Sequence, residues 1–332
     1  MIMIEKVRYG ILGTANIARK RHMPAFRKTG NAEVVAVASR NADRARVFAA
    51  EFDIHSAYGN YDDLLADSQI DAVIVALPNS LHRDWVIKAA TAGKHVLCEK
   101  PLAMNEDEVQ AMIDAASKNN VLLMEGFMYR FHPQHDYVQE VIQSGGIGKV
   151  QAVRAELTYT LPDWKNDSRG QKELGGGALF DAGCYCVNAV RFLMGVEPVS
   201  VQAYYSLHAV NGVDKTTVAI LKFPDDRMAY IATSMEQPFK NTYEVTGLRG
   251  RIIVPNAFPG GMNPTTVLVH SERGEVTKSY DACDHFQNEI EHFSDCILNN
   301  KRPLLGLRDS KNNTIVLQAI ARAARIGKVI EL

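Results

Sequence analysis

The sequence predicts an α/β protein of two domains. The first is built on a parallel sheet, and the second is an α/β domain with a large, mostly antiparallel open sheet. Its 332 residues exceed what one hydrophobic core usually holds. In the first third, short apolar runs alternate with amphipathic helical ones, which is typical of a parallel sheet covered on both faces. From residue 149 onward, strand-like runs follow one another across short turns and indicate an antiparallel meander. We place the boundary near Phe127, which gives domains 1–127 and 128–332.

In the first domain, Asn41 precedes an amphipathic run and is suited to cap it as a helix. A proline, Pro24, is expected to interrupt the first helix. The predicted strands are 7–12, 33–39, 72–76, 95–98 and 121–125. The first predicted helix begins at residue 17, and the others cover 42–52, 61–66, 81–92 and 106–119.

In the second domain, alternating apolar residues predict a meander that is preceded by one glycine-rich helix and followed by two more helices. Whether the last two helices pack back on the first domain is left open. The predicted strands are 150–159, 199–208, 215–223, 228–235, 242–248 and 251–254. The predicted helices are 175–195, 284–298 and 310–325.

Charge and composition argue against several classes of protein. The formal net charge is -1 and no block of lysine and arginine stands out, so nucleic acids and anionic membranes are poor partners. No apolar run is long enough to span a bilayer, and the N-terminus lacks a signal-peptide pattern, so a cytoplasmic protein is expected. The five cysteines are odd in number and scattered, which predicts packed thiols rather than disulfides.

The turn between the first strand and the first helix has the spacing of a dinucleotide-binding fingerprint. It fits the pattern G-x-G-x-x-A, with alanine in place of the second glycine, in the stretch Gly13-Thr14-Ala15-Asn16-Ile17-Ala18. In that fingerprint the backbone approaches a pyrophosphate at the start of the helix. Because the turn follows a strand and opens a helix, it predicts a Rossmann domain that binds a dinucleotide through residues 13–17.

The end of the second strand indicates which dinucleotide is preferred. A domain selective for NAD usually has an acidic residue there, which binds the ribose 2′-hydroxyl. This sequence has Ser39 and Arg40 instead, a hydroxyl and a guanidinium suited to a 2′-phosphate. NADP is therefore predicted to bind more tightly than NAD. Two alternatives stay open: Arg40 as a solvated surface charge, and Asp43 reaching the ribose.

Two further elements carry candidate catalytic side chains. Lys100 follows a buried strand at its carboxyl end, the edge where ligands bind in open α/β sheets. Its ammonium could polarise a carbonyl or favour a phenolate, although a lysine extending from a strand end is common. Asp181 and Tyr185 lie four residues apart in the predicted helix, so they share one face behind three glycines that could leave room for a substrate.

Several longer motifs resemble the Gfo/Idh/MocA oxidoreductases, named for glucose–fructose oxidoreductase and inositol dehydrogenase. The motifs are GILGTANIA, the EKP at 99–101, MEGFMYRFHPQ at 124–134 and GGGALFDAGCYCVNAVRFLMG at 175–195. The sequence is most similar to the branch that holds dihydrodiol dehydrogenases, NADP-dependent D-xylose dehydrogenases and glucose–fructose oxidoreductase. Many members carry histidine four residues after the aspartate, whereas this sequence has Tyr185, as that branch does.

The resemblance implies a Rossmann domain followed by an α/β domain whose large sheet often buries its outer face in a dimer. It implies Lys100 and Tyr185 as the catalytic pair, with Asp181 beside them. By the same analogy, a group of residues lies at the cofactor and the Lys100–Pro101 peptide bond is a candidate for the cis form. That group consists of Pro78, Asn79, His82, Glu99 and Lys100.

Other polar residues have weaker claims to a role. His132 and His135 form an H-x-x-H, but the proline after His132 disfavours a regular helix there, so ordinary packing is favoured and no metal site is predicted. Arg169 precedes the glycine loop and is a candidate substrate-binding residue or a surface charge. Trp164 is as compatible with packing as with a sugar platform.

Together these observations predict an NADP-dependent oxidoreductase that moves a hydride between nicotinamide and a sugar, polyol or cyclic diol, or the matching carbonyl. Tyr185 is predicted to exchange the proton, with Lys100 lowering the pKa of its phenol from the ordinary value of about 10. Two alternatives are a glycosidase that uses NAD(P) transiently and a non-catalytic NADP-binding regulator. A homodimer or larger homo-oligomer is expected.

Overall fold

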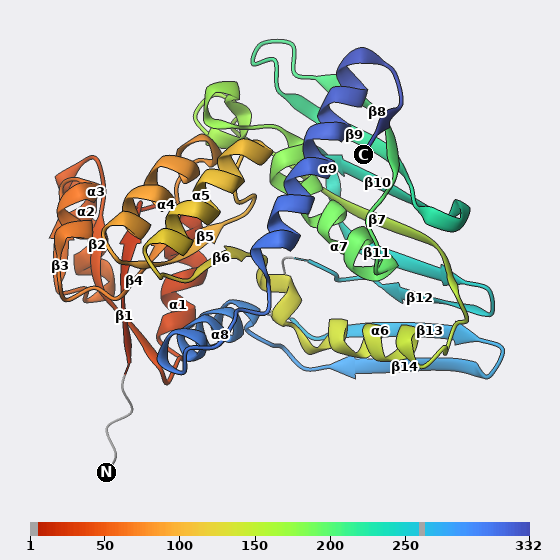
Figure 1. Ribbon diagram of the computed structural model, residues 1–332, viewed down its shortest axis with the longest axis horizontal. Coiled ribbons are helices and arrows are strands. Elements are labelled where there is room, and N and C mark those ends of the chain that lie inside the picture. Colours follow the sequence, from red (N-terminus) through yellow and green to blue (C-terminus); the bar gives the residue numbers. More distant parts are fainter. Residues whose placement is uncertain (1–5, 259–262) are drawn as a thin grey trace. The chain divides into compact units, whose positions relative to one another are not determined.

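The computed structural model describes residues 6–258 and 263–332 (Figure 1). These residues form two compact units, each with its own sheet. The first unit comprises the described part of Met1–Met128 together with Asp284–Lys311. The second comprises the described part of Tyr129–Cys283 together with Asn312–Leu332.

The first unit is built on a six-stranded parallel sheet, which confirms the predicted Rossmann architecture. The strand order is β3-β2-β1-β4-β5-β6, so the order reverses between β1 and β4. Ligands bind at the carboxyl edge beside such a reversal in open α/β sheets. The strands are β1 (Val7–Leu12), β2 (Ala32–Ala38), β3 (Ser56–Tyr58), β4 (Ala72–Val75), β5 (His95–Glu99) and β6 (Leu123–Gly126).

Helices cover both faces of this sheet because successive strand residues point to opposite sides. Tyr9 of β1 packs edge-on against Phe26 and shares a 2.9 Å hydrogen bond with Ser294, so helices α1 and α8 lie on its side. Leu12 belongs instead to the core cluster formed with α3, α4 and α5. The helices are α1 (Met23–Phe26), α2 (Ala42–Phe52), α3 (Tyr61–Ala66), α4 (His82–Thr91), α5 (Glu106–Lys118) and α8 (His285–Leu298).

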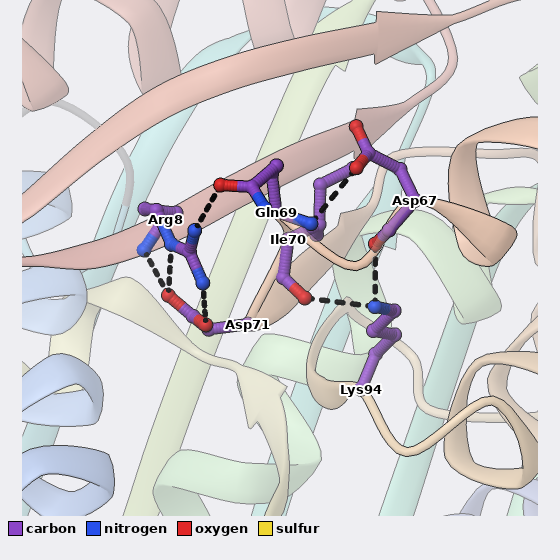
Figure 2. Close-up of polar contacts among 6 residues, drawn as sticks. All are labelled: Arg8, Asp67, Gln69, Ile70, Asp71 and Lys94. Carbon is purple, nitrogen blue, oxygen red and sulfur yellow. Dashed lines mark hydrogen bonds and ion pairs between the residues drawn. The ribbon is translucent and has the colours of Figure 1, made fainter.

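A polar cluster ties together the connections at the amino edge of this sheet (Figure 2). Arg8 donates to both carboxylate oxygens of Asp71, at 2.9 and 2.7 Å. Lys94 is only 7% exposed, and its ammonium donates to the backbone carbonyls of Asp67 and Ile70 at 2.7 and 2.8 Å. By bonding both carbonyls, Lys94 stabilises the turn that leads into β4.

The second unit is built on a nine-stranded sheet, in which every pairing is antiparallel except that between β7 and β10. The predicted open, mostly antiparallel sheet is therefore confirmed, and the pairing of β7 with β10 is its parallel exception. The strand order is β14-β13-β12-β11-β7-β10-β9-β8-β15. The strands are β7 (Val150–Thr160), β8 (Ser200–Leu207), β9 (Asp214–Lys222), β10 (Met228–Ser234), β11 (Glu236–Gly247), β12 (Gly250–Val254), β13 (Thr265–Ser271), β14 (Gly274–Tyr280) and β15 (Ile330–Glu331).

Helix α7 (Cys184–Met194) packs on β7 and β10 of this sheet, and a π-helical turn, Leu179–Gly183, leads into it. Asn313 of α9 (Leu307–Ile326) donates to the carbonyl of Cys184 at 3.3 Å and accepts from Arg191 at 3.2 Å, which fastens α9 to α7. Helix α6 (Pro133–Gln143) lies against β13. Among the described residues, no helix has both the length and the apolar character that crossing a membrane requires.

Most predicted elements are present, and the differences have local causes. The first helix is not interrupted at Pro24: a π-helical stretch, Ala18–His22, runs into α1, where the proline occupies a first-turn position that needs no N–H. Helix α6 and strands β3, β13, β14 and β15 were not predicted. Four cysteines are buried as expected, whereas Cys283 is only half-buried.

Candidate functional site

The predicted cofactor residues follow the carboxyl ends of parallel strands in the first unit. Residues 13–17 follow β1, and Ser39 and Arg40 follow β2. Residues 78–82 follow β4, and Lys100 follows β5 directly. Because the strands are parallel, these four segments share one edge of the sheet, on the two sides of the strand-order reversal.

The turn after β1 fits a dinucleotide phosphate. Gly13 has φ +102°, and a Cβ there would come within 2.7 Å of the Ala76 carbonyl oxygen. Only glycine therefore allows the turn to lie this close to the loop after β4. The Arg19 N–H donates to the Ala15 carbonyl at 3.1 Å, so helical hydrogen bonding begins at the small residue in the second glycine position. The chain enters a helix immediately after the turn, as pyrophosphate binding requires.

The charged residues after β2 differ in their contacts. Arg40 is exposed and interacts with the Tyr61 hydroxyl: burial raises the pKa of Tyr61, and the Arg40 guanidinium opposes that shift. Asp43, the alternative ribose ligand, is instead paired with Arg46 in the first turn of α2. Ser39 is buried, and its hydroxyl accepts from the Asn41 N–H at 3.3 Å. The end of β2 thus presents the guanidinium of Arg40 to a cofactor, whereas the carboxylate of Asp43 is already paired.

Three buried side chains hold the segment that carries Lys100. His22 Nε2 lies 3.0 Å from Glu99 Oε1 before the lysine. After it, His82 Nδ1 lies 2.9 Å from the Pro101 carbonyl, and Glu125 accepts from the Leu102 N–H at 2.8 Å. We call these three contacts the strand-end clamps. The Lys100–Pro101 bond is cis, as the resemblance suggested.

His82 was predicted to lie near nicotinamide, yet its ring is engaged on both sides by the backbone. Nε2 lies 2.8 Å from the Leu77 carbonyl, in addition to the contact of Nδ1 with Pro101. Burial lowers the pKa of His82, although the carbonyl contacts and Glu99 oppose the shift. The imidazole therefore joins two loops at the sheet edge and is poorly suited to exchange a substrate proton. Glu99, also predicted at the cofactor, directs its carboxylate to His22.

In the second unit, Asp181 lies in a polar group that the sequence indicated only in part. Its carboxylate accepts a short hydrogen bond from the Tyr159 hydroxyl on β7. Arg169 stacks over the Tyr159 ring at 5.3 Å and makes a two-pronged ion pair with Asp167, at 2.9 and 2.7 Å. Asp167 and, more weakly, Asp181 and Tyr159 raise the pKa of Arg169, so its guanidinium is always charged. The structure therefore brings Asp181 and Arg169 together around Tyr159.

Tyr185 is buried within the second unit, at 6% exposure, in an aromatic environment. Its ring centroid lies 6.0 Å from that of Tyr129 and 5.8 Å from that of Phe258. Tyr129 is itself fixed, because its hydroxyl donates to Asn188 at 2.5 Å. Lys100 belongs to the first unit and Tyr185 to the second.

Two of the three glycines before α7 make room for protein atoms, a role that the sequence did not indicate. A Cβ on Gly176 would lie 2.4 Å from the Arg169 carbonyl oxygen. Gly177 has φ +117°, and a Cβ there would lie 2.1 Å from a carboxylate oxygen of Asp214. That buried carboxylate accepts from the Leu179 N–H at 2.8 Å at the helix start. The glycines thus let the Arg169 loop and Asp214 pack against the start of the helix.

The other candidates make ordinary structural contacts. His132 caps α6 by accepting from the Gln134 N–H at 3.2 Å, and His135 Nδ1 lies 2.8 Å from the Tyr243 hydroxyl. Within residues 6–258 and 263–332, no cluster of three or more His, Cys, Asp or Glu is arranged to hold a metal ion. One face of the Trp164 ring is covered by His208, with centroids 4.4 Å apart.

Comparison with known proteins places this geometry in a family. The profile "Oxidoreductase family, NAD-binding Rossmann fold" matches residues 7–127. The profile "GFO/IDH/MocA C-terminal domain" matches residues 135–253. The chain belongs to the Gfo/Idh/MocA oxidoreductase family. The expectation drawn from the sequence motifs is thereby confirmed.

Relatives and solved structures show the same membership across nearly the whole chain. A D-xylose 1-dehydrogenase (NADP(+)) from Haloferax volcanii is 37% identical, covering 98% of this chain and 99% of that protein. A trans-1,2-dihydrobenzene-1,2-diol dehydrogenase from Xenopus laevis is 37% identical over 84% of this chain and 86% of that protein. A crystal structure of a 3-ketoreductase from Actinomadura kijaniata with NADP and TDP-benzene is 32% identical, with a TM-score of 0.91 and coverage of 96% and 98%.

Several residues around the candidate side chains were not identified from the sequence. Tyr159 lies 22 positions before its partner Asp181, and His22 lies 77 positions before Glu99. Neither belongs to a local motif, so only the folded chain reveals the pairing. Glu125 could have been noticed, because it ends a predicted strand next to the one that precedes Lys100.

Proposed function

We propose that this oxidoreductase is NADP-dependent and acts on a secondary or anomeric alcohol of a sugar, polyol or cyclic diol, or on the matching carbonyl. The observation that carries the proposal is the carboxyl edge of the first sheet, where a dinucleotide turn follows β1 and a firmly held lysine follows β5, with only β4 between these strands. The relatives named as a D-xylose dehydrogenase, a dihydrodiol dehydrogenase and a sugar ketoreductase support the substrate class.

Residues 13–17 would hold the pyrophosphate, and Arg40 with Ser39 would hold the 2′-phosphate. NADP, when bound, would supply or accept the hydride. The pairing of Asp43 with Arg46 supports the preference for NADP, because the acid that could select a ribose hydroxyl is already engaged. The NADP-bound structure of the ketoreductase relative agrees with this choice.

We propose that Tyr185 exchanges the proton with the substrate oxygen and that the positive charge of Lys100 lowers the pKa of the tyrosine phenol. A phenol ordinarily ionises near pH 10, so a positive charge is needed for it to act as a base near neutrality. The lysine ammonium supplies such a charge and can polarise a substrate carbonyl. Asp181, oriented by Tyr159, is suited to accept a hydrogen bond from a substrate hydroxyl. Arg169 would bind a second oxygen of the substrate.

We also propose that the chain forms a homodimer through the outer face of its nine-stranded sheet. The strand register places Ile220 and Tyr230 side by side, at 52% and 37% exposure, and Tyr204 at 61% lies on the same face two residue pairs away. Exposed aromatic and branched side chains on one open sheet face are costly in a monomer and typical of an interface.

The function is tested by incubating the protein with NADP and a panel of aldoses, polyols and cyclic diols, followed at the nicotinamide absorbance. The reverse direction uses NADPH and the matching carbonyls. Substrate-dependent change in absorbance, faster with NADP than with NAD, is the expected result. Conversion of a glycoside without net change in nicotinamide would favour a glycosidase. Tight NADP binding without any turnover would favour a regulator.

A further inference from the structure

A buried histidine–glutamate pair precedes the lysine at the end of β5. His22 is 2% exposed, and its Nε2 lies 3.0 Å from Oε1 of Glu99, whose side chain is 15% exposed. Phe286 of α8 packs edge-on against the imidazole, with centroids 5.6 Å apart. Replacing such a pair by apolar side chains of similar volume often leaves stability unchanged or raises it. Fold stability alone is therefore a weak reason for this pair.

The position of the pair in the chain suggests a different role. His82 and Glu125 hold Pro101 and Leu102, so two of the strand-end clamps act on the C-terminal side of Lys100. His22 acts on the N-terminal side, through the side chain of Glu99. Removing His22 would leave the N-terminal side of the lysine without this side-chain contact and held by the pairing of β5 in the sheet, while the other side keeps its side-chain contacts.

We propose that His22 is a positioning residue, whose hydrogen bond to Glu99 fixes the strand end from which Lys100 extends. The proposal rests on the function proposed above for Lys100. A catalytic group must be held to within about 0.5 Å of its productive position, usually by residues that never touch the substrate. His22 fits this description, because it is buried and its Nε2 is directed at Glu99.

The charges around the pair agree with this role. Burial raises the pKa of Glu99, but the hydrogen bond and charge of His22, with help from Lys100 and His82, hold it below the ordinary value. On the facing helix α8, burial and the negative charge of Glu99 hold the pKa of Glu289 well above its ordinary value. Of these two buried acids, Glu99 is thus the more readily ionised, and it is the one whose carboxylate His22 contacts.

The first test measures the backbone and does not need turnover. Hydrogen–deuterium exchange of the amides of Glu99, Lys100 and Leu102 is compared in the parent protein, His22→Leu and His22→Gln. The glutamine amide can still donate to Glu99, whereas leucine cannot. Losing a hydrogen bond to a charged group corresponds to about 10- to 100-fold faster exchange in His22→Leu, with a near-parental rate in His22→Gln. Equal exchange in all three proteins would overturn the proposal.

The second test separates positioning from stability. His22→Leu leaves Glu99 buried without this donor and is expected to lower the melting temperature, while the double variant His22→Leu/Glu99→Gln removes the buried charge and should regain stability. If His22 positions Lys100, kcat stays about tenfold or more below the parental value in both variants, and NADP affinity changes little. Recovery of kcat together with stability would show a merely structural role.

A parent enzyme with no turnover would reject the proposed function, and the exchange experiment would still decide whether His22 holds the segment.

Discussion

At the scale of single residues, we propose that Arg40 decides the choice between the two nicotinamide cofactors. It is exposed at the end of β2, near the Tyr61 hydroxyl, whereas Asp43 is paired with Arg46. Arg40→Ala should weaken NADP binding by about 1.5–3 kcal/mol, the range for a charge-assisted hydrogen bond. NAD binding should hardly change, because NAD has no 2′-phosphate. Titration of both cofactors by fluorescence measures this, and equal affinity of the parent for NAD and NADP would contradict it.

Glu289 gives a prediction about pH. It keeps its proton in the folded protein above its ordinary pKa of 4.5, whereas the unfolded chain releases that proton. The free energy of unfolding should therefore fall as pH rises above about 4.5, by up to about 1.4 kcal/mol per pH unit, until Glu289 ionises in the folded state. Glu289→Gln has no proton to lose, so its stability relative to the parent should be greater at pH 8 than at pH 5.

Urea unfolding at the two pH values measures this difference. The exposed residue Glu272 supplies the matched control, since Glu272→Gln should leave the pH profile unchanged. Parallel profiles for the parent and Glu289→Gln would show that Glu289 has no raised pKa.

Sequence reasoning placed residues whose position depends on a recognisable strand or helix. Lys100 and Arg40 could be named as candidates because each follows such a strand, and the structure has them at those strand ends. The partners of these residues could not, because a contact such as His22 with Glu99 is created by packing between distant segments. The packing role of Gly177 could not be predicted for the same reason, since Asp214 lies 37 residues after it.

At the scale of elements, the amino edge of the first sheet depends on one buried lysine. Lys94 bonds the carbonyls that precede β4, and burial lowers the pKa of its ammonium. Lys94→Met keeps an apolar chain but removes the donor, so the free energy of unfolding should fall by about 1.5–3 kcal/mol. Lys149→Met is the control, because the exposed pair with Asp225 should contribute less than about 1 kcal/mol. Equal melting temperatures for the two variants would contradict this account.

Helices and strands with a clear hydrophobic periodicity or a helix-capping residue were predicted closely. Elements that lack such a signal were missed. Asn41 accepts from the Arg44 N–H at 3.0 Å, so α2 begins where the cap signal placed it. Helix α6 was not predicted, because the proline after His132 favours an extended over a helical conformation at His132 and so argues against a helix there. In fact the extended conformation is what a capping residue adopts, with φ −90° and ψ 128° at His132. The parallel pairing of β7 with β10 has no local signal at all.

At the scale of the whole molecule, the open face of the second sheet predicts assembly. The protein should be a dimer at micromolar concentration, and sedimentation velocity measures its mass. Replacing Ile220 and Tyr230 together by glutamate should give monomers, because buried charges at an interface core are strongly unfavourable. Val47→Glu, at a 64% exposed position on α2, should remain dimeric. A parent protein that sediments as a monomer would exclude this interface.

The two-sheet architecture itself followed from the sequence, because apolar runs alternating with helices and a later series of short strands have few compact solutions. Family membership, shown by profiles over 7–127 and 135–253, agrees with that reading of the chain.

We propose that Tyr185 passes the proton and that Lys100 supplies the charge that makes this transfer efficient. The most direct test is the turnover number of Tyr185→Phe, which keeps the ring and removes only the hydroxyl. We expect kcat to fall by about 10²–10⁴ with NADP affinity nearly unchanged, a loss at least as large in Lys100→Met, and a double variant little worse than the poorer single one. A Tyr185→Phe enzyme that turns over at a near-parental rate would contradict the account.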